Sequence, residues 1–204
     1  MPFWLRRFPL AILGLTVLVG LSVDQRLAAQ QEAAAEYDYL LLATNRTSTM
    51  QEEMQEAAES GYVFAGVMGG DTSFGGSEVV VVMQRRPDSE PRFEYRLLAT
   101  SKTSTMQNEL QEAGDAGFLF RGQTVFGTTF GGDEPVVILE RDRDMVSPDL
   151  FEYRLLATKK TSTMQDEIRE AGAAGFEFVG VTVASTAFGG DEIVAILKRP
   201  IADQ

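Results

Sequence analysis

The chain has 204 residues, a formal net charge of −12, and neither cysteine nor histidine. The lack of cysteine excludes disulfides, thiolate metal sites and a cysteine nucleophile, and the lack of histidine removes the commonest general base and metal ligand. A surface this acidic repels phosphate backbones and anionic headgroups, so we expect no nucleic-acid partner.

The N-terminal residues have the organisation of a secretory signal. Arg6 and Arg7 precede an apolar run over residues 8–23, and small residues follow at 28–29. This order predicts a signal peptide over residues 1–29. The apolar run is shorter than the roughly 20 residues of a membrane-spanning helix. We therefore expect a periplasmic or secreted protein without stable membrane insertion after cleavage, and an uncleaved anchoring helix is the alternative.

Three copies of one block follow, at residues 37–85, 93–141 and 151–199, and they align without gaps. Polar linkers that contain proline separate them, at residues 86–92 and 142–150. Each block reads as strand, helix, strand, strand. The sequence thus predicts an α+β fold of three tandem β-α-β-β modules, each a small, mostly antiparallel three-stranded sheet with one helix packed on one face.

The second copy illustrates the expected elements. Over residues 93–100, apolar side chains alternate with mainly polar ones, which predicts a strand with one apolar face. Ser104 and Gln107 have the spacing of a capping box, as do Ser and Gln in the other copies, and so predict a helix start. Apolar residues then recur at helical spacing, at Met106, Leu110 and Ala113. Gly117 stands where a left-handed helix cap is expected.

The last two strands set the packing problem. Gly122, with Gly66 and Gly180 in the other copies, marks a bulge or a close backbone approach in the second strand. The last strand, residues 193–197 in copy three, is apolar on both faces, whereas one helix covers only one face. We expect the second faces to carry Leu42, Leu98 and Leu156 and to be buried by modules packing on each other, because about 50 residues bury too little surface alone.

The pattern Gly175-Phe-Glu-Phe-Val-Gly180, followed by Ile193-Val-Ala-Ile-Leu-Lys-Arg-Pro200, resembles a small bacterial family, the domain of unknown function number 4177. The resemblance covers each block and implies the same order of strands and helix. The chain departs from the family by phenylalanine in place of tryptophan and by a longer loop before the last strand. The family carries no established catalytic residues, so the resemblance assigns no site.

The helix starts are one candidate site. A cation precedes Thr-Ser-Thr in each copy, so hydroxyls, free amides and a positive charge converge as an anion site requires. The residues concerned are Arg46 with Ser48, Lys102 with Ser104, and Lys160 with Ser162. The alternative is that each serine caps its helix and each cation is solvated.

The loops before the last strands are a second candidate. Each has Phe-Gly-Gly followed by acidic residues, namely Glu78, Asp133 with Glu134, and Asp191 with Glu192. Such carboxylates bind a ligand or calcium, or perform acid–base chemistry. The alternative is an ordinary glycine turn whose phenylalanine packs in the core. Calcium needs six or more oxygens, so we assign no metal.

These patterns favour a non-catalytic binding or scaffolding protein of the cell envelope. Export, repetition and acidity coincide with missing catalytic residue types, and tandem modules multiply weak contacts through effective concentration. We expect an envelope protein or polymer as partner, no cofactor and no catalytic residue. The alternatives are small-anion binding at the helix starts and a carboxylate-dependent hydrolase acting on envelope polymers.

Overall fold

The computed structural model describes residues 36–72, 76–100, 102–127, 133–146, 149–185 and 191–201. The signal peptide expected at residues 1–29 lies outside these ranges. Among the residues that the structure does describe, no helix combines the length and the apolar character needed to cross a membrane.

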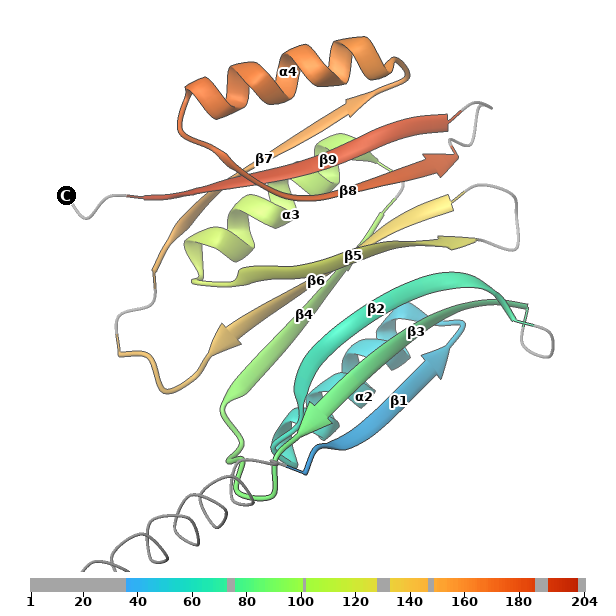
Figure 1. Ribbon diagram of the computed structural model, residues 1–204, viewed down its shortest axis with the longest axis vertical. Coiled ribbons are helices and arrows are strands. Elements are labelled where there is room, and N and C mark those ends of the chain that lie inside the picture. The colour runs from blue at the N-terminus through green and yellow to red at the C-terminus, as the bar shows by residue number, and fades with distance from the viewer. Residues whose placement is uncertain are drawn as a thin grey trace, which may run out of the picture. The chain divides into compact units, whose positions relative to one another are not determined.

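Three successive segments each contain a strand, a helix and two further strands (Figure 1). Module 1 comprises β1 (Asp38–Thr44), α2 (Thr47–Glu59), β2 (Val63–Thr72) and β3 (Gly76–Arg85). Module 2 comprises β4 (Phe93–Ala99), α3 (Thr103–Asp115), β5 (Leu119–Gly127) and β6 (Asp133–Asp142). Module 3 comprises β7 (Phe151–Thr158), α4 (Thr161–Ala173), β8 (Glu177–Ser185) and β9 (Asp191–Pro200). The predicted α+β fold of three β-α-β-β modules is confirmed.

Each module forms an antiparallel three-stranded sheet with its last strand in the middle, in the orders β1-β3-β2, β4-β6-β5 and β7-β9-β8. The last strand is apolar on both faces because, in modules 2 and 3, its two faces pack in different hydrophobic clusters. A bulge interrupts the second strand before each expected glycine, at Gly66, Gly122 and Gly180. The glycines that follow the helices adopt the predicted positive φ, at Gly61, Gly117 and Gly175.

The predicted capping boxes are wrong, because the helices begin before the serines. The N-cap positions belong to Arg46, Lys102 and Lys160, and none of the three helices has a side-chain cap. Each N-cap residue instead donates its own backbone N–H to the hydroxyl of a threonine two residues earlier, as Arg46 does to Thr44 at 3.2 Å. The serines therefore lie inside the first turn.

The prediction for the faces of the first strand is wrong: the face expected to turn away from the module's own helix lies against that helix. Leu98, expected on the second face, packs in one cluster with Met106 and Leu110 of its own helix. Leu42 and Leu156 likewise pack on the helix side of their own modules. Tyr95 instead joins the cluster around α2 of the preceding module. The face of β4 toward its own helix also carries Glu94 and Arg96, so the more apolar face of the strand is the one that packs on the preceding module.

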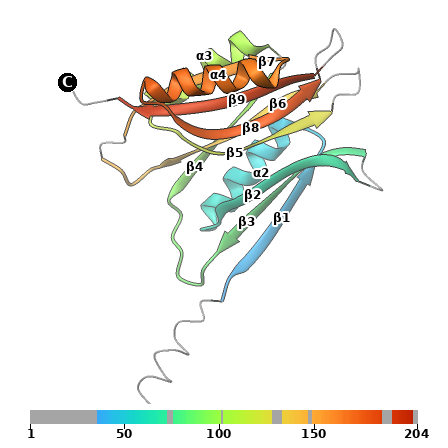
Figure 2. The same ribbon diagram turned by 45° about the horizontal axis from the view of Figure 1, so that its top comes forward.

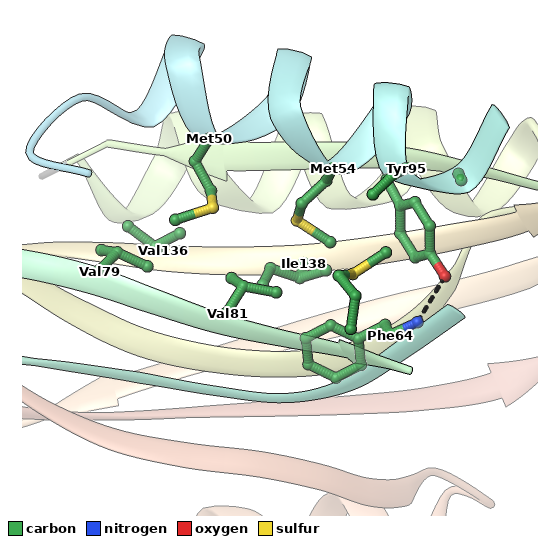
Figure 3. Close-up of a cluster of buried hydrophobic side chains, with 11 residues drawn as sticks. Met50, Met54, Phe64, Val79, Val81, Tyr95, Val136 and Ile138 are labelled. Carbon is green, nitrogen blue, oxygen red and sulfur yellow. Dashed lines mark hydrogen bonds between the residues drawn. The ribbon is translucent and has the colours of Figure 1, made fainter. Parts of the chain in front are cut away.

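Successive modules share their hydrophobic cores (Figure 3). Met50 and Met54 of α2 and Val81 of β3 cluster with Val136 and Ile138 from the central strand of module 2. Ile196 of module 3 joins the cluster around α3 in the same way. The expectation that modules bury each other's second faces is thus confirmed for modules 2 and 3. In module 1 the equivalent residues, Val80 and Val82, are only half-buried.

Each helix also lies against the first strand of the next module, α2 against β4 and α3 against β7 (Figures 1 and 2). The second strands follow the same succession, with β2 against β5 and β5 against β8. The described part of the chain from Tyr37 onward is therefore one compact unit of three modules that share their cores.

In each module an arginine near the end of the last strand links the first strand to the end of the helix. Arg85 forms an ion pair with Asp38 at 2.8 Å and donates to the backbone carbonyl of Ser60 at the end of α2. Its guanidinium lies 4.5 Å from the ring centroid of Tyr62. The hydrogen bond from Tyr62, followed by the one from Arg85, lowers the pKa of Asp38. Arg141 and Arg199 repeat the contacts with carboxylate, carbonyl and ring in their own modules.

Two equivalent helix glycines predict opposite effects of one substitution. A Cβ at Gly114 of α3 would lie 2.1 Å from the carbonyl oxygen of Phe151, whereas a Cβ at Gly172 of α4 meets nothing within 4 Å. We expect Gly114→Ala to lower the free energy of unfolding by about 1–3 kcal/mol, because backbone must move. Gly172→Ala should raise it by up to about 1 kcal/mol through helix propensity. Urea unfolding measures both, and equal effects would contradict the packing of α3 on β7.

Candidate functional site

The residues proposed for an anion site lie at three separate helix starts. Arg46, Lys102 and Lys160 are exposed N-cap residues, and Ser48, Ser104 and Ser162 are exposed in the first turns. Around the start of α2 there is a cavity of ≈ 340 Å³ whose lining includes Ser48 but also Glu52 and Glu109. The negative charges of these two carboxylates disfavour the binding of an anion in this cavity. Anion binding at the helix starts stays a prediction.

The acidic residues proposed for a ligand loop lie at the starts of the last strands. Glu78 is in β3, Asp133 and Glu134 open β6, and Asp191 and Glu192 open β9. Consecutive strand residues point to opposite faces of a sheet, so the carboxylates of Asp191 and Glu192 do not converge. The phenylalanines of these loops, at positions 74, 130 and 188, lie outside the described residues. Within the described ranges, no group of three or more acidic residues is placed to hold a metal.

Helix glutamines form hydrogen bonds from one module to the next. The sequence pattern indicated only Gln51 and Gln107 of these, as members of capping boxes. Gln51 of α2 accepts a hydrogen bond from the backbone N–H of Leu97 at 2.9 Å, and Gln55 accepts one from Tyr95 at 3.2 Å. Strand β4 is at the edge of its sheet, where backbone groups lack a neighbouring strand. The side-chain amides of α2 take the place of that strand.

The same contact recurs between modules 2 and 3. Gln107 accepts a hydrogen bond from Leu155 N–H at 2.7 Å and donates to the carbonyl of Tyr153 at 2.9 Å. Gln111 accepts from Tyr153 N–H at 3.1 Å. Glutamine repeated at i and i+4 on the polar side of a helix is the sequence signal for this role. In α4, Gln165 and Arg169 occupy these two positions.

A tyrosine from each following module binds the bulged strand of the preceding one. Tyr95 accepts a hydrogen bond from Phe64 N–H at 2.8 Å, drawn in Figure 3, and donates to Glu140 at 2.7 Å. Tyr153 accepts from Phe120 N–H at 2.7 Å and donates to the carbonyl of Phe118. Burial, then the Glu140 carboxylate, raises the pKa of Tyr95. Burial raises the pKa of Tyr153 to about 12.

Glu140 is the buried carboxylate at this contact, with 8% of its surface exposed. Burial raises its pKa, while the Tyr95 hydroxyl and Arg121, whose Nε lies 3.5 Å from a Glu140 oxygen, oppose the change. Gln84 and Lys198 occupy the equivalent positions in the other modules. The carboxylate is therefore particular to module 2, and its partners Tyr95 and Arg121 belong to the same module.

The two ends of the module series expose the side chains that are buried at the internal contacts. Tyr39 on β1 is 62% exposed, whereas its equivalents Tyr95 and Tyr153 are 3% and 2% exposed. At the other end, Phe178 on β8 is 47% exposed, against 6% for Phe64. Leu41 on β1 and Val181 and Val183 on β8 are also exposed. These two groups of exposed apolar side chains lie on β1 and β8, and contiguous apolar surface of this kind marks a binding region.

Comparison with known proteins finds no family model that matches the chain, no matching curated protein and no matching solved structure. The resemblance to the domain of unknown function number 4177 therefore stays an expectation from the sequence motifs.

Removing one hydroxyl tests the tyrosine contact. Tyr95→Phe leaves the Phe64 N–H and the Glu140 carboxylate without their buried partner, so we expect a loss of about 1–3 kcal/mol of unfolding free energy. Tyr39→Phe is the matched control, because that side chain is exposed, and its effect should be within about 0.5 kcal/mol. Equal losses in chemical unfolding of the two variants would contradict a special role for Tyr95.

Glu140 predicts a pH dependence of stability. The pKa of Glu140 is raised in the folded chain. As the pH rises above the ordinary pKa of glutamate, the unfolded chain therefore loses this proton at a lower pH than the folded chain does. The contribution of Glu140 to stability is therefore largest in acid and falls as the pH rises through the raised value. Glu140→Gln introduces the side chain that module 1 has at Gln84 and removes this dependence. The stability of Glu140→Gln relative to the native chain should therefore rise from mildly acidic to neutral pH.

Urea unfolding across that pH range makes the measurement. Glu112→Gln on the exposed side of α3 controls for the loss of one negative charge. If the two variants change in parallel with pH, burial of Glu140 does not govern the dependence.

Proposed function

We propose that this chain is an exported, non-catalytic binding or scaffolding protein of the cell envelope. The observation that supports the proposal best is where the specific polar contacts lie. Glutamines 51, 55, 107 and 111, with Tyr95 and Tyr153, are used to join one module to the next. The side chains equivalent to these tyrosines and to the phenylalanine they face are exposed at the ends of the series, at Tyr39 and Phe178.

The shared cores support a scaffold with fixed spacing. Met54 and Ile138 of different modules lie in one buried cluster, as do Leu110 and Ile196. Modules that share buried clusters do not move independently of one another. The surfaces at β1 and β8 are therefore held at a constant separation, and a partner bound at one end presents a defined geometry to a partner at the other. Linked sites of this kind gain avidity through effective concentration.

The expected partner is an envelope protein with an apolar contact surface and edge-strand or helix groups to pair with. Strand β1 is an edge strand with exposed Leu41, and a sheet edge binds another chain through backbone hydrogen bonds. The net charge of −12 disfavours anionic polymers as partners. Export itself is supported by the predicted signal peptide at residues 1–29.

Site-specific crosslinking in a native-like bacterial host tests the proposal. A photoreactive residue is placed at Leu41 or Val183 in the two end surfaces, and at exposed Glu112 on α3 as the control. We expect protein adducts from the end positions and few from the control, in the envelope fraction, on a chain that begins near residue 30. Absence of adducts at both ends, or recovery of the uncleaved chain in the cytoplasm, would contradict it.

A further inference from the structure

Two contacts between modules repeat one geometry, so the chain contains a template for a third. At each contact the preceding module supplies a helix with glutamines and a bulged strand with a free N–H. The following module supplies an edge strand with a tyrosine. The hydroxyl accepts that N–H at 2.8 Å for Tyr95 and 2.7 Å for Tyr153.

Both halves of this contact are present, without each other, at opposite ends of the described chain. We define the head surface as Tyr39, Leu41 and the edge of β1 together with Gly66 of β2. We define the tail surface as α4 with Phe178, Val181 and Val183 of β8. Tyr39 has the position of Tyr95, and the described residues of module 3 have no following tyrosine to meet Phe178. Each surface is complementary to the other.

The tail surface retains groups that serve the internal contacts. Gly172 of α4 occupies the position at which Gly114 of α3 lets the Phe151 carbonyl approach and at which α2 has buried Ala58, yet around Gly172 the space is open. A glycine inside a helix is unfavourable unless close packing requires it. Gln165 likewise retains the amide that in Gln107 pairs with the next strand.

The head surface shows the same complementarity. At the internal contacts the ring of Phe64 lies over Gly122, 3.1 Å from the position of an added Cβ, and Phe120 lies over Gly180 at 2.7 Å. Gly66, the equivalent glycine of module 1, has nothing within 4 Å. The exposed ring of Phe178 is the group that this position lacks.

We propose that the tail surface of one chain binds the head surface of a second copy, in the geometry that already joins modules 1 to 2 and 2 to 3. The proposal rests on the proposed scaffolding function and names its first partner. Tyr39 of one copy accepts the Phe178 N–H of the other, and Gln165 pairs with the backbone of β1. Such a contact joins two different surfaces, so it continues from copy to copy and gives either a closed ring or an open filament.

One substitution makes this contact weaker than the internal ones. Arg169 stands where Gln55 and Gln111 accept a backbone N–H, and a guanidinium has no acceptor. The chains also carry like net charge, which opposes association at low ionic strength. Association therefore depends on protein concentration and strengthens with added salt.

Two variants, each blocked at one end, give the decisive test with the full chain. Leu41→Glu charges the head surface, and Gly172→Gln fills the tail surface with a bulky, helix-favouring side chain. Both positions are exposed in the single chain, so both variants should fold, and Gly172→Gln should melt no lower than the native chain. Sedimentation velocity and light scattering measure their size over a wide range of concentration.

We expect the native chain to form species larger than a monomer with rising concentration, while each blocked variant stays monomeric. The mixture of the two variants should form a one-to-one dimer and nothing larger, because only one head and one tail remain open. Tyr39→Phe should weaken native association about tenfold without changing monomer stability.

Three results would overturn the inference: a native chain that stays monomeric, association that persists in Leu41→Glu, or blocked variants that do not combine. If the native chain is monomeric yet residues 41 and 183 crosslink to other envelope proteins, the scaffolding function stands and self-association fails. If the chains associate but no envelope adducts to other proteins form, self-association stands and the wider scaffold fails.

Discussion

The structure depends on one mismatch: each module has a sheet that is apolar on both faces and only one helix to cover it. In modules 1 and 2 the helix, and the sheet face that it covers, also pack against the second sheet face of the module that follows. Met50 and Met54 lie in one buried cluster with Val79 and Val81 of their own sheet and with Val136 and Ile138 of module 2. The buried tyrosines and the glutamines on strand edges follow from this arrangement, because backbone and hydroxyl groups enclosed between modules must find partners there.

Much of the fold could be read from the sequence. The repeats gave the order of elements, Gly117 gave a helix end, and Gly122 gave a bulge, because these features depend on local backbone conformation. The helix start was misplaced because Ser104 and Gln107 have the spacing of a capping box. The residue at the N-cap is instead Lys102, whose N–H is bound by the hydroxyl of Thr100. The faces of the first strand were reversed because the more apolar face, which carries Tyr95, packs on the neighbouring module and not on its own helix.

The candidate sites were harder for a physical reason. The charged residues Lys102 and Asp133 stand out in the sequence. The groups that join the modules are instead neutral amides and hydroxyls, whose role depends on a strand about 45 residues further along the chain, as with Gln51 and Leu97. Glu140 was missed for a similar reason: it lies on the face of β6 that carries Val136 and Ile138, which pack against module 1.

The arrangement also gives the chain a direction. Modules 1 and 2 are each completed by the module that follows, whereas the described part of module 3 has no successor and its buried cluster around Ala171 and Phe176 is the smallest of the three. Local opening is therefore expected first around α4. A chain that emerges N-terminus first presents α2 before β4 and α3 before β7, so the helix that each of these strands packs against is already present.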